Sequence, residues 1–379
     1  MEFQAINIEE LEARIELTRF HAGEVTEFHA MLHIAPRGDI FTHQLSRLQE
    51  AEKALKNLDI LAGAQVVFKR YFLSDATNQV PLIHEEDRCT ISYIQQPPLD
   101  GSKIAVWLYL QRGTDISHVN ESTVATHNGY RHIWTMGLTN STVDTSYMQT
   151  WKTLFAYIDI LKMFDATLEA NCIRTWFFVR DVDTQYGGLV KSRRECFVEQ
   201  GLTQDTHYIA STGIGGNPAD PKALVQLGSY ALTGFQPQQQ RYLYAPTHLN
   251  KTYEYGVTFE RGTLMQYGDR NHIYISGTAS INNKGEVVHI GDIVNQTLRM
   301  WENVEKLLEE GNMTYNDVMQ LIVYLRDGAD YQVVKKMFDE KFPNIPCILT
   351  LAPVCRPTWL IEMECIAVKS ANNPNFRPF

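Results

Sequence analysis

The hydrophobic positions of the chain alternate between two spacings. Residues 46–61 carry apolar side chains every three to four positions, which places them on one face of a helix. Residues 66–75 follow, and they are mostly aliphatic and aromatic, as is typical of a buried strand. The pattern therefore predicts a helix followed directly by a strand.

This helix–strand pair recurs along the chain. The predicted helices are 46–61, 148–168 and 295–308, and the strands that follow them are 66–75, 172–181 and 318–327. Each strand ends at or just before an aspartate, namely Asp75, Asp181 and Asp327. Near-equal spacing between corresponding residues in three copies indicates an internal repeat.

Each copy also begins and ends with an apolar stretch. The opening strands are expected at 27–33, 132–137 and 272–279, and the closing strands at 104–110, 224–232 and 360–368. Such a unit is predicted to be α+β, a mixed sheet with two helices on one face. The expected units are 1–115, which is degenerate, 128–234 and 258–370, with a Pro- and Gln-rich linker at 235–257.

The last closing strand carries two carboxylates. Glu362 and Glu364 fall on one face of it, and Ile361, Met363 and Cys365 fall on the other. A polar face normally points to water. The turn before the strand, however, brings a thiol and a guanidinium close to its start. A carboxyl group held there against apolar neighbours would stay protonated near neutral pH, so Glu362 is a candidate general acid.

Composition excludes several classes of function. The net charge of −10 argues against nucleic-acid binding, which requires a dense basic surface. No basic-then-apolar leader and no membrane-length apolar stretch is present, so we expect a cytoplasmic protein. The six cysteines lack CxxC spacing, and the twelve histidines form no HxH or HExxH pattern. We therefore expect reduced thiols, no metal and no cofactor.

The third copy contains motifs of a known family. They are the segment 274–280 (YISGTAS), Gly291-Asp292, Gln296-Thr297, Asn303-Val304 and the strand 360–368 (LIEMECIAV). These motifs resemble the RidA/YjgF superfamily, also called endoribonuclease L-PSP-like, whose domains have a chorismate-mutase-like fold. Members of that family are trimers with sites in the clefts between subunits. The resemblance implies that three tandem units form a single-chain pseudo-trimer, and hence a monomer.

Within this superfamily the chain is most similar to the chorismatases. The likeness is carried by the segments 95–101, 174–176 with Arg193 and Phe197, 211–215, which is expected to be a glycine-rich loop, and 277–280 with Cys355 seven residues before Glu362. The resemblance implies a hydrolase that protonates the enol ether of chorismate, or of a related cyclic carboxylate, and releases pyruvate. Glu362 would be the acid, and Cys355 would line the site as a small apolar residue rather than as a nucleophile.

The substrate implied by this resemblance is a small carboxylate anion. Its carboxylates would pair with Arg174 and Arg193, and Arg356 is the alternative partner. Backbone amides at Thr212, Gly213, Gly277 and Thr278, with Ala279 beside them, would complete the site, because glycines let an anion approach the main chain. The chain departs from the chorismatases at 192–195, Ser-Arg-Arg-Glu, where they carry Arg-Tyr-Arg or a similar sequence.

Two other functions remain open. Simple RidA proteins hydrolyse enamines and imines, but the arginine that grips their substrates corresponds to Val354 here. A small-molecule binding protein with a degenerate cleft is the other alternative. The first closing strand, 104–110, contains no acid, so we expect one working cleft, between the second and third copies.

Overall fold

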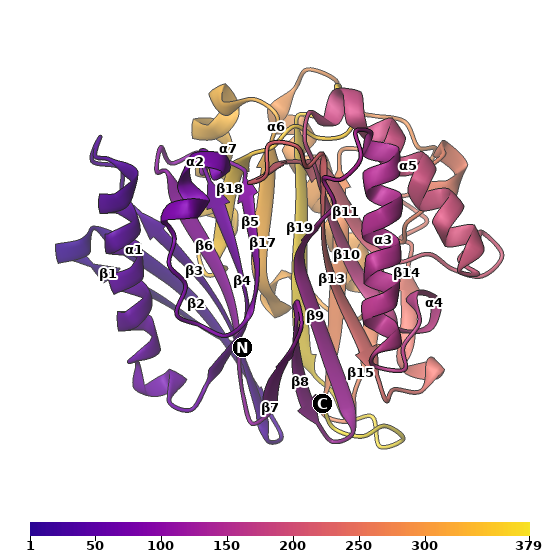
Figure 1. Ribbon diagram of the computed structural model, residues 1–379. Helices are drawn as coiled ribbons and strands as arrows, with labels where there is room; N and C mark the ends of the chain where they lie inside the picture. The colour runs from indigo at the N-terminus through magenta and orange to yellow at the C-terminus, as the bar shows by residue number, and fades with distance from the viewer.

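The computed structural model describes residues 1–379, which form three β-sheets (Figure 1). The N-terminal sheet has the strand order β1-β2-β3-β6-β4-β5-β12. Its strands are β1 (Glu2–Ile8), β2 (Ala13–Ala22), β3 (Val25–Ile34), β4 (Gln65–Leu73), β5 (Thr90–Gln95), β6 (Ile104–Arg112) and β12 (Asn217–Pro218). The β4–β5 pair is parallel and the other pairs are antiparallel, so the sheet is mixed.

The second sheet has the order β11-β10-β13-β9-β8-β7. Its strands are β7 (Asp115–Val119), β8 (Ser122–His127), β9 (Tyr130–Thr139), β10 (Cys172–Val179), β11 (Ala210–Gly215) and β13 (Val225–Thr233). Its helices are α3 (Ser146–Lys162), α4 (Leu168–Asn171) and α5 (Val182–Glu199). Only β10 and β11 are parallel.

The third sheet has the order β14-β15-β16-β19-β17-β18. Its strands are β14 (Gln240–Leu243), β15 (Gly262–Gln266), β16 (Arg270–Ala279), β17 (Val318–Leu325), β18 (Cys347–Leu351) and β19 (Ile361–Ser370). The helices α6 (Ile293–Glu310) and α7 (Tyr331–Lys341) belong to this part of the chain. Strand β14 lies inside the expected linker 235–257 and pairs with β15, so this stretch forms the edge of the third sheet.

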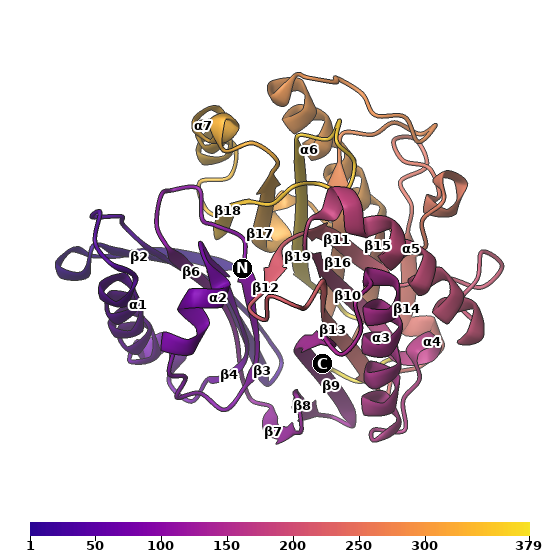
Figure 2. The same ribbon diagram turned by 45° about the horizontal axis from the view of Figure 1, so that its top comes forward.

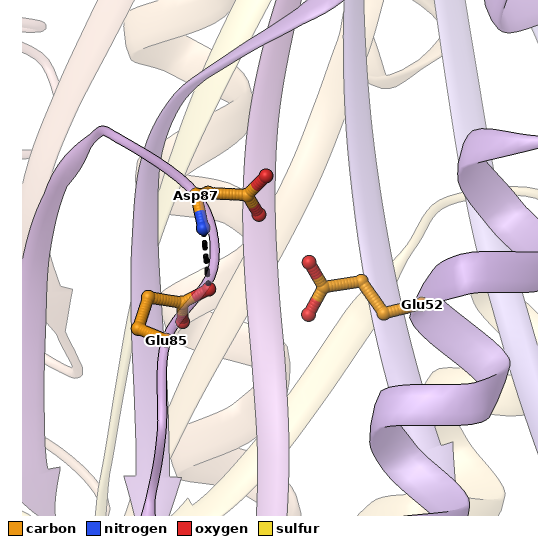
Figure 3. A group of neighbouring side chains, drawn as sticks. All are labelled: Glu52, Glu85 and Asp87. Atoms are coloured by element: carbon orange, nitrogen blue, oxygen red, sulfur yellow. Dashed lines mark hydrogen bonds between the residues drawn. The ribbon is translucent and has the colours of Figure 1, made fainter.

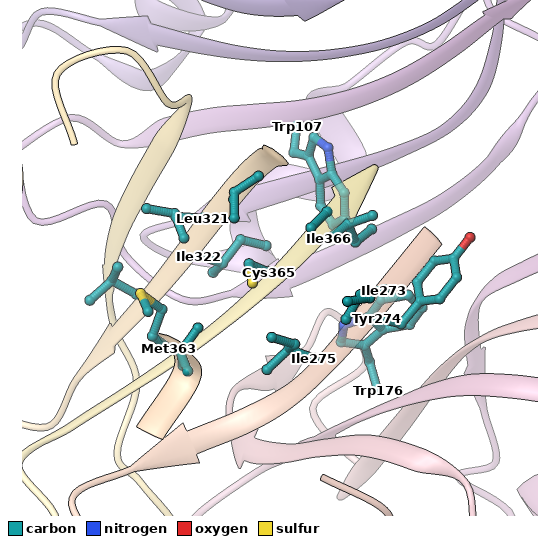
Figure 4. Close-up of a cluster of buried hydrophobic side chains, with 14 of the residues drawn as sticks. Trp107, Trp176, Ile273, Tyr274, Ile275, Leu321, Ile322, Met363, Cys365 and Ile366 are labelled. Atoms are coloured by element: carbon teal, nitrogen blue, oxygen red, sulfur yellow. The ribbon is translucent and has the colours of Figure 1, made fainter. Parts of the chain in front are cut away.

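The long helices lie on the outside and the sheets face one another at the centre, as Figure 2 shows. A continuous apolar core joins the three sheets, with Trp107 from β6, Trp176 from β10 and Leu321 from β17 all buried (Figure 4). Each large apolar side chain buried in this way contributes about 1.5–3 kcal/mol to folding. The α+β class and the tandem three-unit arrangement predicted from the sequence are confirmed.

Some boundaries differ from the prediction. The first unit has one long helix, α1 (Phe41–Lys56), and its second is the single turn α2 (Ala76–Gln79). The helix expected over 148–168 ends at Lys162, because Asp165 adopts a left-handed backbone conformation with φ of 55°. A separate turn, α4, then begins where the Thr167 hydroxyl accepts a hydrogen bond from the backbone N–H of Ala170.

The segment 211–215 was expected to be a glycine-rich loop, and this is wrong, because it lies in strand β11. Its backbone pairs in parallel with β10, from Arg174 opposite Ala210 onwards. The glycines permit close packing instead of a turn. A Cβ on Gly213 would lie 3.0 Å from the ring of Tyr186, and one on Gly215 would lie 2.8 Å from Pro353.

None of the helices combines the length and the apolar character needed to cross a membrane.

Candidate active site

A pocket lies between the second and third sheets, where one working cleft was expected. Its walls come from α5, β11, β16, β19, the segment 252–261 and the segment 355–359 before β19. The lining residues are Tyr186, Arg193, Ser211, Gly213, Tyr255, Val257, Phe259, Arg261, Gly277, Ala279, Ile281, Cys355, Arg356, Trp359 and Glu362. The free space inside is about 40 Å³, which holds no more than a few water molecules.

Glu362 is the one carboxyl group in this lining. Strand β19 places it opposite Ala279 of β16 and Tyr324 of β17, on a central strand and close to the end of the sheet where β16 and β17 finish. Its side chain is buried and makes no hydrogen bond within the protein. Burial, helped by the negative charge of Glu364, raises the pKa of Glu362 to about 8, against smaller opposing effects of Arg174 and Arg261. Glu362 is therefore a neutral carboxylic acid at pH 7, as general-acid chemistry requires.

Glu364, two residues further along the same face, has the opposite surroundings. Its Oε2 accepts hydrogen bonds from Arg174 Nη2 at 2.7 Å and from the Thr212 hydroxyl. Its Oε1 accepts one from Trp176 Nε1 at 2.9 Å and a longer one from Arg70 Nη1 at 3.4 Å. Glu364 is thus a buried, ion-paired carboxylate that does not line the pocket.

Gly277 gives the Glu362 side chain its place. A Cβ at residue 277 would lie 2.1 Å from Glu362 Oε1 and 2.8 Å from its Cδ. Only glycine leaves room for the carboxyl group against the backbone of β16. The N–H of Gly277 donates a hydrogen bond to the Thr212 hydroxyl at 2.9 Å, so this amide does not point at a ligand.

The other residues expected at the site divide into two groups. Gly213, Ala279, Cys355, Arg193 and Arg356 line the pocket. Arg174, Thr212 and Thr278 do not. The Arg174 guanidinium binds Glu364 and Thr212 instead of facing the cavity, and the Thr278 hydroxyl donates to the carbonyl of Ser276 at 2.9 Å.

Three guanidinium groups reach the pocket. Arg193 is buried, and it donates from Nε to the Thr258 hydroxyl at 3.2 Å while its Nη2 has no partner in the protein. Arg356 lies over the rings of Tyr255 and Trp359, at 4.7 and 4.8 Å from their centroids. Arg261 uses Nε and Nη2 to bind Asn250. With Glu362 neutral, the lining is strongly cationic and suits an anion.

Among the lining residues that sequence reasoning missed are Arg261, Tyr186 and Tyr255. Arg261 directly precedes β15, in a stretch whose motifs carried no family likeness. Tyr186 lies on α5, about two helical turns before Arg193, and burial keeps its pKa well above the usual value. A helical projection of α5 that placed Arg193 inward would also have placed Tyr186 near the same face.

Cys355 lies in the lining as a thiol. Burial raises its pKa to about 12, and the nearby Glu362 acts in the same direction. A thiolate is the nucleophilic form of cysteine, so this group is inert at neutral pH. The expectation that Cys355 lines the site as a small apolar residue agrees with this environment.

Another cluster of acids lies far from this pocket, in the first unit. Glu52, Glu85 and Asp87 bring their carboxylates together, as Figure 3 shows. The Nζ of Lys69, which is almost fully buried, contacts all three of them at 2.6, 2.5 and 2.5 Å. This ammonium group, together with that of Lys56, which contacts Glu52 and Asp87, supplies the positive charge that these carboxylates need.

Comparisons with known proteins agree with this architecture. The endoribonuclease L-PSP family model matches residues 264–369. A RutC family protein of Pyrococcus abyssi is 37% identical over 102 residues, which are 26% of this chain and 80% of that protein. The 3-aminoacrylate deaminase RutC of Acinetobacter baylyi is 33% identical over 99 residues, 26% of this chain and 79% of that protein. The chain belongs to this family, the RidA superfamily.

Longer matches extend beyond the third unit. A 3-hydroxybenzoate synthase of Streptomyces hygroscopicus is 23% identical over 239 residues, which are 58% of this chain and 70% of that protein. The crystal structure of a chorismatase superposes with a TM-score of 0.62 at 17% identity, covering 80% of this chain and 93% of that one. The chain therefore shares the three-unit fold of a chorismatase.

Proposed function

We propose that the protein is a chorismatase-like hydrolase that cleaves the enol ether of chorismate, or of a related cyclic carboxylate, and releases pyruvate. One observation carries the proposal. Glu362 is a neutral carboxylic acid without a protein partner, and it faces a pocket that also contains Arg193, Arg261 and Arg356. An acid beside several cations suits a substrate that is an anion and must be protonated.

The reaction begins with proton transfer from Glu362. The proton goes to the terminal carbon of the enolpyruvyl group, and the electron pair of the C=C bond forms the new C–H bond. The adjacent carbon becomes an oxocarbenium ion, which water attacks while the Glu362 carboxylate accepts a proton from that water. The hemiketal collapses to pyruvate and a ring alcohol. Substrate and one water are consumed, and the acid is regenerated.

The guanidinium groups account for binding. Chorismate carries two carboxylates, and Arg193 has an unpaired Nη2 while Arg261 uses only Nε and Nη2 in its own hydrogen bonds. Charge-assisted hydrogen bonds from these groups would hold the substrate with its vinyl carbon towards Glu362. The similarity to a 3-hydroxybenzoate synthase and the fold of a chorismatase support this choice of substrate.

The closed pocket implies a motion on binding. A space of about 40 Å³ is too small for a six-membered ring with substituents. The segment 252–260 covers the pocket with Tyr255, Val257 and Phe259, and Gly256 has a φ of 91°, which suits a flexible turn. We infer that this cap moves outwards to admit the substrate.

An enamine or imine deaminase is the second candidate. The similarity to 3-aminoacrylate deaminase and the position of Glu362 on the closing strand favour it. At the place of the arginine expected for such enzymes, Val354 is buried and its carbonyl accepts a hydrogen bond from Arg326. That position has no group for a substrate carboxylate. A binding protein without turnover is the third candidate.

The decisive experiment mixes the protein with chorismate and follows pyruvate and ring products by chromatography. We expect pyruvate from the natural protein and at least about a hundredfold loss in Glu362→Gln, the scale expected for a general acid. Glu302→Gln, on the exposed face of α6, is the matched control and should keep full activity. Absence of pyruvate at any protein concentration would reject the hydrolase. Ammonia release from 2-aminoacrylate would then identify a deaminase. Binding of chorismate without turnover, measured by calorimetry, would identify a binding protein.

A further inference from the structure

The carboxylate of Glu364, on β19 of the third sheet, is held by residues from the other two sheets. Arg70 comes from β4, Arg174 and Trp176 from β10, and Thr212 from β11. All of these side chains are buried, and none of them lines the pocket. The family comparisons and the proposed reaction assign no role to this network.

The Thr212 hydroxyl is the centre of the network. Its oxygen accepts hydrogen bonds from Arg174 Nη2 at 2.5 Å and from the backbone N–H of Gly277 at 2.9 Å. Both partners are donors, so they occupy the two lone pairs of this oxygen. The hydroxyl proton therefore points towards its acceptor, Glu364 Oε2. The orientation of this hydroxyl is thus determined by its neighbours.

The same reasoning fixes the protonation of the two glutamates. Every partner of the Glu364 oxygens is a donor, and none of them can accept a proton from it. Glu364 is therefore an acceptor with no proton of its own. Since two neighbouring carboxyl groups in a buried site do not both ionise readily, the proton of this pair resides on Glu362.

Thr212 also supports Glu362 mechanically. The Gly277 N–H that it binds belongs to the stretch of backbone against which the Glu362 carboxyl lies. One hydroxyl thus connects the ionised Glu364 with the surface that positions the acid.

We propose that Thr212 and Arg174 are positioning residues. They fix Glu364 as a carboxylate and hold Gly277 in place. In this way they keep the proton on Glu362 and hold its carboxyl group towards the pocket. This rests on the proposed function, in which Glu362 donates that proton. The charged and titratable groups around Glu362 come from several elements. Glu364 lies on its own strand, Arg174 on β10 and Tyr324 on β17. The groups that share the pocket with it are Tyr186, Arg193, Tyr255, Arg261, Cys355 and Arg356.

The test compares Thr212→Val with Thr212→Ser. Valine keeps the shape but removes the hydroxyl, so Glu364 loses a donor and competes for the proton of Glu362. We expect kcat at pH 7 to fall about 10- to 100-fold in Thr212→Val, the scale of one general-acid contribution. KM should stay within about twofold, because the hydroxyl does not line the pocket. Thr212→Ser should restore kcat.

The pH profile separates this role from a structural one. As the pH falls, Glu362 takes its proton from the solvent whatever its neighbour does, so the deficit of Thr212→Val should shrink. Three results would each overturn the proposal. They are a deficit that is equal at every pH, a rise in KM without a fall in kcat, and a pH profile of Thr212→Val that is identical to that of the natural protein.

A second measurement does not need turnover. The ¹³C NMR signals of the Glu362 and Glu364 carboxyl carbons, assigned with Glu362→Gln, report directly where the proton resides. We expect Glu362 protonated and Glu364 ionised at pH 7 in the natural protein, and a proton shared between the two in Thr212→Val. Identical titrations in both proteins would reject the proposal. If pyruvate is not released but the NMR result is as expected, the proposed reaction fails while the network is upheld.

Discussion

Gly277 and Glu362 lie so close that no side chain fits between them. A Cβ at residue 277 would be 2.1 Å from Glu362 Oε1, well inside contact distance. We expect Gly277→Ala to push the carboxyl group away from the pocket and to lower kcat about a hundredfold, because a misplacement of about 1 Å has that cost. Steady-state kinetics with chorismate measures the effect.

The matched control is Gly187→Ala. Gly187 lies in α5, and a Cβ there meets no atom within 4 Å. We expect full activity and a gain of about 1 kcal/mol in the free energy of unfolding from the better helix former. Equal activity of the two alanine variants would contradict the positioning of Glu362 by Gly277.

The activity should depend on pH through Glu362. Its pKa is raised to about 8, so the acid is protonated throughout the neutral range. We expect kcat to be level below pH 8 and to fall tenfold per pH unit above it, as the group that must donate the proton loses it. A rate profile from pH 5 to 10 measures this limb. A profile that still rises above pH 8 would show that another group is the acid.

Stability should depend on the same group with a definite sign. The pKa of an unfolded glutamate is about 4.3, so between this pH and about 8 the folded protein keeps a proton that the unfolded chain has lost. The contribution of Glu362 to stability is therefore lost as the pH rises through that window. We expect Glu362→Gln to gain on the order of a few kcal/mol relative to the natural protein between pH 5 and pH 8. Urea unfolding at both pH values measures the difference.

Arg261 should bind substrate although no sequence motif indicated it. It lines the pocket, and the Nη1 of its guanidinium makes no hydrogen bond to the protein. We expect Arg261→Met to weaken binding of a dicarboxylate about 10- to 100-fold, the value of one charge-assisted hydrogen bond. Calorimetry with Glu362→Gln as the background measures binding without turnover. Arg37→Met, which removes an exposed ion pair with Glu12, should leave affinity unchanged.

Lys69 should matter for stability rather than for activity. Its ammonium group is shared by Glu52, Glu85 and Asp87. We expect Lys69→Met to cost about 3–5 kcal/mol, because the three carboxylates would lose their buried cation and keep only Lys56, which contacts Glu52 at 2.7 Å and Asp87 at 2.6 Å. Calcium at millimolar concentration should restore part of the loss in the variant, since carboxylate oxygens are its usual ligands. Thermal unfolding with and without calcium measures this, and an equal effect of calcium on the natural protein would contradict it.

The sequence allowed the repeated helix–strand units to be found because apolar spacing is a local property. The same is true of Glu362, whose neighbours Ile361 and Met363 mark the strand as a buried one. Arg174 was expected to bind substrate, but the structure turns its guanidinium towards Glu364 of another sheet. That contact depends on how two sheets meet, and no spacing along one strand contains this information.

The glycines of β11 illustrate the same limit. Gly213 and Gly215 suggested a loop, since glycine is the usual residue of turns. Their role is to let Tyr186 and Pro353 approach a strand, and both partners lie far away in the sequence. Tyr255 was missed for a related reason, because the stretch 235–257 was expected to be a linker and its end instead covers the pocket.

Strand β12 has a consequence for how the chain is made. Asn217 and Pro218 pair with β5 and so complete the first sheet, and the Gln96 side chain donates a hydrogen bond to the carbonyl of Gly215 at 2.7 Å. A polypeptide leaving the ribosome exposes β5 as an open edge until more than a hundred further residues have emerged. Nascent chains that stall within this interval carry an unpaired strand edge, and we expect chaperones to bind these forms of the protein most strongly.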